Sequence, residues 1–368
     1  MNKLFKIVTV LVAVLLAVAA AELILRLGGW GADAAPEHAH LLRYDATIGW
    51  TKIPNGSVVY RYAGHRIHET SNSFGGRGRE LEDSSPRVLF LGDSFCEGYL
   101  VGDGEVFSSV LERLLPALAS INLGVAGYST DQEYLLYQRD GARLQPQLVV
   151  VLFFDNDVWF NSVIQEYRAK KPVFKTTEAG LRLTGVPVPP PDRSIAAAPC
   201  ADCPSSIRLL QLIERASRRV SPSAQGTAAR PAVPNELQVY HHQETAEIGG
   251  AWQLTEALLK RLRQATGNRL VVFYVPTVAA VYDDSWRQTR QLYGLDDGWD
   301  IHLAESRLAE ICLRMAIPMV SPTWQFRQQA RRGKLLYFIE DGHWNSGGHR
   351  LAAEILAQFL KRRDLTSR

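Results

Sequence analysis

The chain contains, at positions 87–98, the stretch Arg87-Val88-Leu89-Phe90-Leu91-Gly92-Asp93-Ser94-Phe95-Cys96-Glu97-Gly98. The apolar residues 88–91 are typical of a strand that is buried on both faces, as in a parallel sheet. Gly92 allows the backbone to turn sharply where this strand ends. Open α/β sheets bind ligands at the carboxyl ends of their strands. The stretch therefore predicts an α/β fold with Ser94 at the reactive edge of the sheet, although capping of the next helix is the simpler role for a lone serine.

Further apolar runs follow along the chain, and helical patterns separate them. Strands are predicted at 121–123, 148–154, 270–275 and 317–320, and the segments between them carry apolar residues at helical spacing. Strands joined by helices form a parallel sheet that is covered on both faces. We therefore expect a flavodoxin-like, three-layer α/β/α domain with a parallel five-stranded sheet over residues 86–368.

Two segments differ from this alternation. Residues 31–85 combine turn residues with short apolar and aromatic alternations, which predict a small β-rich extension. Residues 163–240 are rich in proline, serine and alanine, and only one helix, around 207–218, is predicted there. Loops of this length are uncommon in compact domains unless they are functional or disordered. We expect an insertion at about 163–240 that is partly flexible and is a candidate cover for the substrate cleft.

Residues 1–30 form a separate apolar segment. Lys3 and Lys6 precede an apolar run at 7–21, and apolar character resumes at Leu23. A membrane span needs about 20 apolar residues, whereas the core of a signal peptide is shorter. We favour a retained single-pass transmembrane helix over a cleaved signal peptide. The two lysines then predict that the catalytic domain lies on the periplasmic, extracytoplasmic side of the inner membrane.

Composition limits the other function classes. The chain has 41 basic and 38 acidic residues and a net charge of +3, which is too small to favour nucleic acid as a partner. Cys200 and Cys203 lie in a proline-rich segment, where an oxidising compartment favours a local disulfide. A zinc site needs two further ligands, and His241 and His242 lack the paired spacing of such sites. No metal and no cofactor are expected, and the sequence does not reveal which protein partners the chain has.

A base and an acid for Ser94 occur together near the end of the chain. A serine hydroxyl becomes a good nucleophile when a neighbouring base takes its proton, and an acid usually orients that base. Asp341 lies two residues before His343 in a predicted loop, so its carboxylate can reach one ring nitrogen while the other faces outward. Gly127 and Asn156 follow the second and third predicted strands and are candidate oxyanion donors. Taken singly, each is also an ordinary turn or cap residue.

Together these blocks resemble the SGNH, or GDSL-like, hydrolase family. Gly92-Asp93-Ser94 is similar to its first block, and Asp341-Gly342-His343 is similar to its last. Gly127 falls where the glycine of the second block is expected, and Asn156 falls where the asparagine of the third is expected. The resemblance implies the SGNH hydrolase fold, a triad of Ser94, His343 and Asp341, and an oxyanion hole formed by Ser94, Gly127 and Asn156.

The chain departs from the family pattern in two places. The third block usually has a glycine two residues before its asparagine, and Phe154 stands there. In much of the family the acid precedes the histidine by three residues, which gives Glu340; the two-residue spacing of Asp341 resembles polysaccharide O-acetyltransferase relatives. We predict Asp341 as the triad acid, with Glu340 as the alternative. Membrane-anchored members also carry a segment similar to Asn72–Gly78, and the sequence gives it no role.

The sequence thus predicts a membrane-anchored serine esterase that hydrolyses O-acyl esters, with O-acetyl esters of glycans as the favoured substrates. An O-acyltransferase that passes the acyl group to an envelope or exopolysaccharide proceeds through the same acyl-enzyme and is the first alternative. A glycan-binding scaffold without catalysis is the second. The expected partners are an acylated small-molecule or glycan substrate and the membrane.

Overall fold

The computed structural model describes residues 3–27, 41–81, 86–166, 169–191 and 230–363. Two compact units are present. The first contains α1 (Lys3–Leu27) and residues 60–66, and the second contains the other described residues. The division predicted from the sequence, at residues 30 and 85, stays a prediction.

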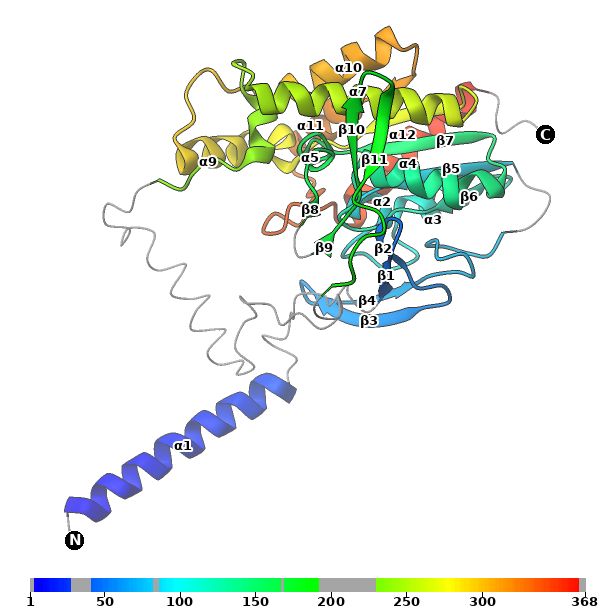
Figure 1. Ribbon diagram of the computed structural model, residues 1–368. Helices are drawn as coiled ribbons and strands as arrows, with labels where there is room; N and C mark the ends of the chain where they lie inside the picture. The colour runs from blue at the N-terminus through cyan, green and yellow to red at the C-terminus, as the bar shows by residue number, and fades with distance from the viewer. Residues whose placement is uncertain (1–2, 28–40, 82–85, 167–168, 192–229, 364–368) are drawn as a thin grey trace. The chain divides into compact units, whose positions relative to one another are not determined.

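A five-stranded parallel sheet forms the centre of the second unit (Figure 1). Its strand order is β13-β12-β7-β5-β6. The strands are β5 (Arg87–Gly92), β6 (Ala119–Asn122), β7 (Leu148–Phe153), β12 (Leu270–Tyr274) and β13 (Met319–Val320). All neighbouring pairs are parallel, with Phe90 of β5 opposite Asn122 of β6 and Val150 of β7. Counted along the chain, this is the flavodoxin-like order 2-1-3-4-5, so the predicted sheet is confirmed.

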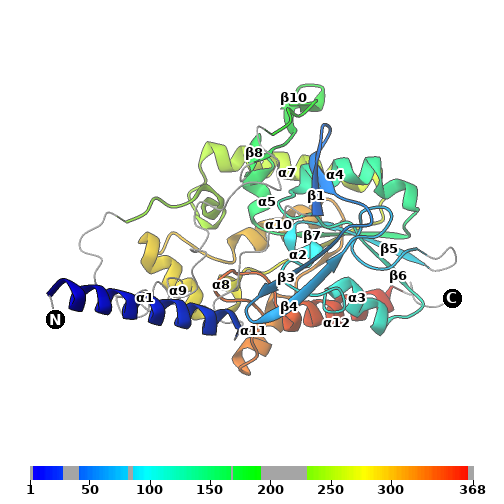
Figure 2. The same ribbon diagram turned by 90° about the horizontal axis from the view of Figure 1, so that it is seen from below.

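Helices cover both faces of this sheet, which confirms the three-layer arrangement (Figures 1 and 2). One face packs against α4 (Thr130–Arg139), α7 (Ala246–Ala265) and α10 (Leu303–Arg314). The other packs against α3 (Phe107–Leu114), α11 (Thr323–Arg331) and α12 (Ser346–Arg362). Successive strand residues face opposite layers, so Leu89 and Leu91 join the first apolar cluster, and Val88 and Phe90 join the second.

Further helices lie between these elements along the chain. They are α2 (Ser94–Glu97), α5 (Asn156–Phe160), α8 (Val278–Val281), α9 (Asp283–Tyr293) and the 3-10 helices η2 (Gly141–Leu144) and η4 (Asn235–Tyr240). Two of them, α2 and α5, begin directly after neighbouring strands of the sheet. Their first residues therefore lie at its carboxyl edge.

In the described part of the chain, four pairs of short strands lie outside the central sheet. The pairs are β1 (Leu42–Asp45) with β2 (Gly49–Lys52), β3 (Ser57–Tyr62) with β4 (His65–Thr70), β8 (Gln165–Glu166) with β9 (Ala169–Lys170), and β10 (Val173–Thr177) with β11 (Gly180–Thr184). The sequence did not predict the β10–β11 hairpin, which docks through Phe174 onto the ring of Tyr134 in α4 at a centroid distance of 5.8 Å.

Two expectations for the insertion lie outside the described residues. These are the helix at 207–218 and the disulfide between Cys200 and Cys203. Among the residues that are described, no group of three or more His, Cys, Asp or Glu side chains is arranged to hold a metal ion.

The apolar segment at the start of the chain forms α1, a single helix of 25 residues. Across the described residues, however, no helix combines the length and the apolar content that a bilayer span requires. The expected transmembrane helix is therefore not supported. The apolar run that suggested it ends within the helix, where Glu22 and Arg26 add charges.

Candidate active site

Ser94 lies at the carboxyl end of β5 and is the first residue of α2. The capping role belongs to Asp93, whose carboxylate accepts a hydrogen bond from the Phe95 N–H at 2.8 Å. At Gly92 a Cβ would lie 2.6 Å from the Cβ of Cys96, so the turn has no space for a larger residue. Because Asp93 caps the helix, the Ser94 hydroxyl is left for another partner.

That partner is His343, from the other end of the chain. Nε2 of His343 lies 2.7 Å from Oγ of Ser94, although the two residues are 249 positions apart. The other ring nitrogen, Nδ1, contacts the carboxylate of Asp341. The side chains of His343 and Asp341 are 22% and 24% exposed, so solvent and solutes reach this pair. A hydroxyl, an imidazole and a carboxylate in this order can activate the hydroxyl by general-base catalysis.

Backbone hydrogen bonds fix the turn that carries the acid and the imidazole. Phe338 N–H donates to the carbonyl of His343 at 2.8 Å, and Asp341 N–H donates to the carbonyl of Phe338 at 3.1 Å. Gly342, between the two side chains, has φ of 91°, a conformation that favours glycine. Asn345 then caps α12. Of the two acids considered from the sequence, it is Asp341 that this turn brings to the ring.

Aromatic rings restrict the orientation of the imidazole. The ring centroids of Phe95 and Tyr99 lie 4.8 Å and 4.7 Å from that of His343. Phe95 in turn packs against Trp344 at 5.2 Å and Phe154 at 4.8 Å. Phe95 and Trp344 are 3% and 0% exposed, so they act as packing residues rather than as a sugar-stacking surface.

Gly127 and Asn156 follow the two strands that flank the strand before Ser94. Gly127 follows β6 and has φ of 76°, and Asn156 opens α5 directly after β7. Since β6 and β7 flank β5, all three residues lie at the same edge of the sheet. The side-chain oxygen of Asn156 is buried and has no hydrogen-bond partner among the described residues. This placement suits oxyanion donors, and that role stays a prediction.

Asp155, next to Asn156, makes a buried contact that the sequence did not predict. Its carboxylate accepts hydrogen bonds from the hydroxyls of Tyr240 at 2.6 Å and Tyr274 at 2.8 Å. Burial raises the pKa of Asp155 to about 7, although the two hydroxyls act to lower it. Because Tyr240 belongs to η4 and Tyr274 to β12, the contact joins three distant segments behind α5.

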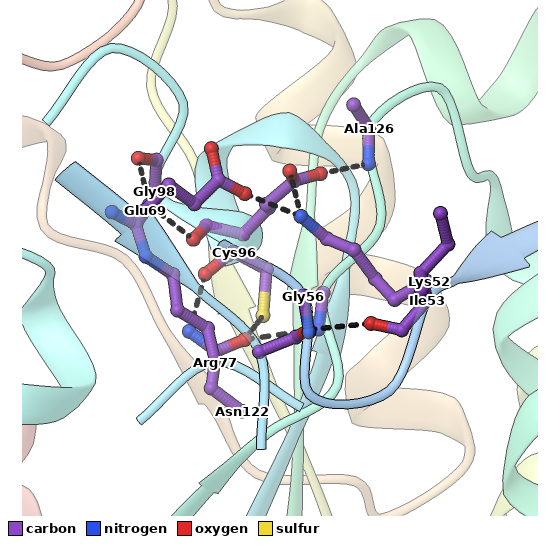
Figure 3. A network of polar contacts seen from close by, with 12 residues as sticks. Lys52, Ile53, Gly56, Glu69, Arg77, Cys96, Gly98, Asn122 and Ala126 are labelled. Atoms are coloured by element: carbon purple, nitrogen blue, oxygen red, sulfur yellow. Dashed lines mark hydrogen bonds and ion pairs between the residues drawn. The ribbon is translucent and has the colours of Figure 1, made fainter. Parts of the chain in front are cut away.

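A buried polar network behind α2 was also missed (Figure 3). The ammonium of Lys52 contacts the carboxylates of Glu69 and Glu97, and all three side chains are at most 5% exposed. Arg77 donates to the carbonyl of Glu97 at 3.0 Å and so satisfies the end of α2. Arg77 belongs to the segment Asn72–Gly78, which therefore has a structural role. The signal available in the sequence was that these charged residues lie in stretches that are otherwise apolar or turn-forming, which is where buried ion pairs can be expected.

Comparison with known proteins decides the family. Residues 90–351 match the model of the GDSL-like lipase/acylhydrolase family. The chain belongs to this family. The matched segment begins in β5 and ends in α12, so it includes both Ser94 and His343.

Solved structures of GDSL-like and related esterases are similar to this chain at low identity. A lipase/acylhydrolase from Enterococcus faecalis is 13% identical, with a TM-score of 0.40, over 76% of this chain and 96% of its own. A catalytic mutant of an acetylxylan esterase from Geobacillus stearothermophilus is 14% identical, with a TM-score of 0.38, over 78% of this chain and 97% of its own. A search of curated proteins found no match.

Membership of the GDSL-like family makes the protein a carboxylic ester hydrolase with the SGNH hydrolase fold. The departure at Phe154 has a structural counterpart. Where the family usually has glycine, the Phe154 ring packs against Phe95, which itself packs against the imidazole of His343. The aromatic residue therefore adds a second layer of support behind that ring.

Proposed function

We propose that the protein is a serine esterase that hydrolyses O-acyl esters, with O-acetylated glycans as the first substrate class. The observation that carries the proposal is the 2.7 Å distance between Ser94 Oγ and His343 Nε2, with Asp341 on the far side of the ring. Family membership supports ester hydrolysis. The glycan substrate rests on the two-residue spacing of Asp341 and His343, which resembles polysaccharide O-acetyltransferase relatives.

The reaction begins with acylation of the serine. Ser94 Oγ attacks the ester carbonyl carbon while His343 Nε2 takes the hydroxyl proton. Asp341 holds the ring in the tautomer that leaves Nε2 free and stabilises the imidazolium that forms. The N–H groups of Ser94 and Gly127, together with the amide of Asn156, donate to the developing oxyanion. The tetrahedral intermediate then breaks its bond to the alcohol, which leaves with the proton from His343.

Deacylation repeats these steps with water. His343 takes a proton from a water molecule as its oxygen attacks the acyl carbon. Collapse of the second tetrahedral intermediate releases the carboxylic acid, and the proton returns to Ser94. The partial exposure of His343 and Asp341 gives water access to the same face of the ring.

Replacement of the nucleophile tests this proposal. We expect Ser94→Ala to lower kcat for aryl acetates by at least about 10³-fold, since the acyl-enzyme can no longer form. Labelling by a serine-directed phosphonate should disappear with it. Ser346→Ala is the matched control, because Ser346 is an exposed serine three residues after His343. Full activity and labelling of a folded Ser94→Ala protein would overturn the assignment and favour a non-catalytic scaffold.

Transfer of the acyl group to a glycan is the second candidate function. The spacing of Asp341 and His343 favours it as well, and the chemistry differs only in that a carbohydrate hydroxyl takes the place of water in deacylation. Product analysis with an aryl acetate, with and without an oligosaccharide acceptor, separates the two functions. Free acetate in both reactions indicates hydrolysis, and acetylated oligosaccharide at the expense of acetate indicates transfer.

A location at the inner membrane, with the catalytic domain on its extracytoplasmic side, also stays a proposal. It rests on Lys3 and Lys6, which precede the apolar run of α1. Fractionation of cells that produce the full chain tests it, and recovery of the protein in the cytoplasmic fraction alone would contradict it.

A further inference from the structure

Strand β2 brings two buried side chains to the loop that carries Gly127. Trp50 and Lys52 are 3% and 5% exposed, and they lie two residues apart in β2. Alternate residues of a strand project to the same side, so both point toward the centre of the second unit. β2 lies before residue 90 and is therefore outside the segment that matches the family model.

Trp50 acts on the peptide unit that contains the Gly127 N–H. The indole Nε1–H of Trp50 donates to the carbonyl of Ala126 at 3.0 Å. This carbonyl and the Gly127 N–H belong to one planar peptide, so a bond that fixes the carbonyl also fixes the direction of the N–H. Tyr128 packs edge-on against Trp50 at 5.8 Å and donates its hydroxyl to the Trp50 carbonyl. Tyr128 therefore contacts both the ring and the backbone of Trp50.

Lys52 acts on the same loop through Glu97. The carboxylate of Glu97 accepts a hydrogen bond from the N–H of Ala126 and also contacts the ammonium of Lys52. Glu97 is the last residue of α2, the helix that Ser94 opens. One carboxylate thus joins α2, the helix that begins with Ser94, to the residue before Gly127.

The charge on Glu97 depends on its buried partner. Burial raises the pKa of Glu97 to about 7, and Lys52 acts in the opposite direction. The ammonium of Lys52 contacts the carboxylate of Glu69 as well. Without Lys52, two buried carboxyl groups would face each other, and protonation would weaken the hydrogen bond that Glu97 accepts from Ala126.

We propose that Trp50 and Lys52 are positioning residues for acyl transfer, which hold the Ala126–Gly127 peptide so that the Gly127 N–H meets the developing oxyanion. The inference rests on the proposed function, in which Gly127 is a donor and Ser94 the nucleophile. A different reading is that both side chains only pack the extension against the sheet. The two readings differ in kinetics, because an oxyanion donor acts on the transition state more than on bound substrate.

The test removes the indole N–H and keeps the ring. Replacing the indole of Trp50 by benzothiophene through a non-canonical amino acid preserves the shape, and Trp50→Phe and Lys52→Met are the conventional variants. We expect kcat for an aryl acetate to fall roughly 10- to 100-fold with KM within about twofold. This is less than the loss of kcat when an oxyanion donor is removed, because a donor that points in a wrong direction keeps part of its stabilising effect. Phosphonate labelling should slow in parallel, because the phosphoryl oxygen takes the oxyanion position.

Tyr137→Phe is the matched control. Tyr137 is a buried residue of α4, and its hydroxyl donates to the carbonyl of Ala265 at 3.4 Å. The variant removes a partly buried hydrogen bond that involves neither Trp50 nor the Ala126–Gly127 peptide, so we expect lower stability with kcat within about twofold. If the folded benzothiophene protein keeps the kcat of this control, the inference is wrong. Failure of this inference can be distinguished from failure of the proposed function, because the latter would appear as full activity of the Ser94→Ala protein.

Discussion

A single glycine decides which carboxylate reaches the imidazole. Gly342 lies between Asp341 and His343 with φ of 91°, and this conformation folds the turn so that the side chains on either side meet. Glu340 precedes the turn, is exposed, and is not the partner of Nδ1. The residue spacing common in the family therefore does not transfer to this chain.

The first prediction concerns these two acids. We expect Asp341→Asn to lower kcat roughly 10²- to 10⁴-fold, because the amide favours the wrong tautomer of His343 and cannot stabilise the imidazolium. Glu340→Gln, the control, should leave kcat within about twofold. Steady-state kinetics of both folded variants with an aryl acetate provide the measurement. A larger loss in Glu340→Gln than in Asp341→Asn would assign the acid to Glu340.

At the scale of elements, the loop after β6 packs directly on α2. A Cβ at Gly124 would lie 2.3 Å from the backbone nitrogen of Glu97 and 2.6 Å from the carbonyl carbon of Cys96. The side chain of Asn122 completes this contact, since it donates to the carbonyl of Cys96 at 2.7 Å and accepts from the N–H of Gly124 at 2.9 Å. The backbone of α2 and the backbone of the loop after β6 are therefore in direct contact.

The second prediction follows from this close approach. We expect Gly124→Ala to lower the free energy of unfolding by about 3 kcal/mol, because two stretches of backbone must separate to admit the methyl group. Gly104→Ala is the control, since the added methyl group would meet nothing within 4 Å, and it should change stability by less than about 1 kcal/mol. Chemical denaturation measures both. Equal unfolding midpoints for the two variants would contradict the packing described.

The elements themselves were predictable where local pattern decides them. The apolar runs at 88–91 and 148–154 became β5 and β7, and the helical spacing after residue 303 became α10. The β10–β11 hairpin was not predictable, because its strands are stabilised by docking on α4, a contact between distant segments. α1 formed as a helix, but the membrane span expected from the same residues is not supported.

The site could be predicted only in part, for a related reason. Ser94, Asp341 and His343 lie in short local blocks, and strand order then brings those blocks together. Trp50 and Lys52 belong to no such block. Their contacts with Ala126 and Glu97 arise from the packing of β2, and nothing in the sequence near residue 50 encodes that partner.

At the scale of the whole molecule, the folded chain buries an ionisable group that its unfolded form would expose. Asp155 is buried, and its pKa is raised from 3.8 to about 7. A group whose pKa is higher in the folded state contributes its full stability below the unfolded pKa, and this contribution is lost as pH rises through the folded pKa. Between these two values the unfolded chain is ionised at Asp155 and the folded protein is not.

The third prediction is the pH dependence that results. The wild-type free energy of unfolding, minus that of Asp155→Asn, should fall between about pH 4 and pH 7 by at most about 1.4 kcal/mol per pH unit. Outside this window the difference should be flat. Denaturation across the pH range measures it, with Asp284→Asn as the control for loss of a carboxylate at the surface. A difference that rises with pH would contradict the burial of Asp155.

Ser94 and His343, the proposed nucleophile and base, are 249 positions apart, and this separation sets when activity can arise during synthesis. While the ribosome is still translating, the growing polypeptide already carries its hydroxyl on β5 but lacks the imidazole, which arrives with the last loop before α12. A chain that stops before His343 has no base for Ser94, so the proposed mechanism predicts that it is inactive toward esters. In the proposed mechanism, only molecules translated beyond His343 can cleave an ester.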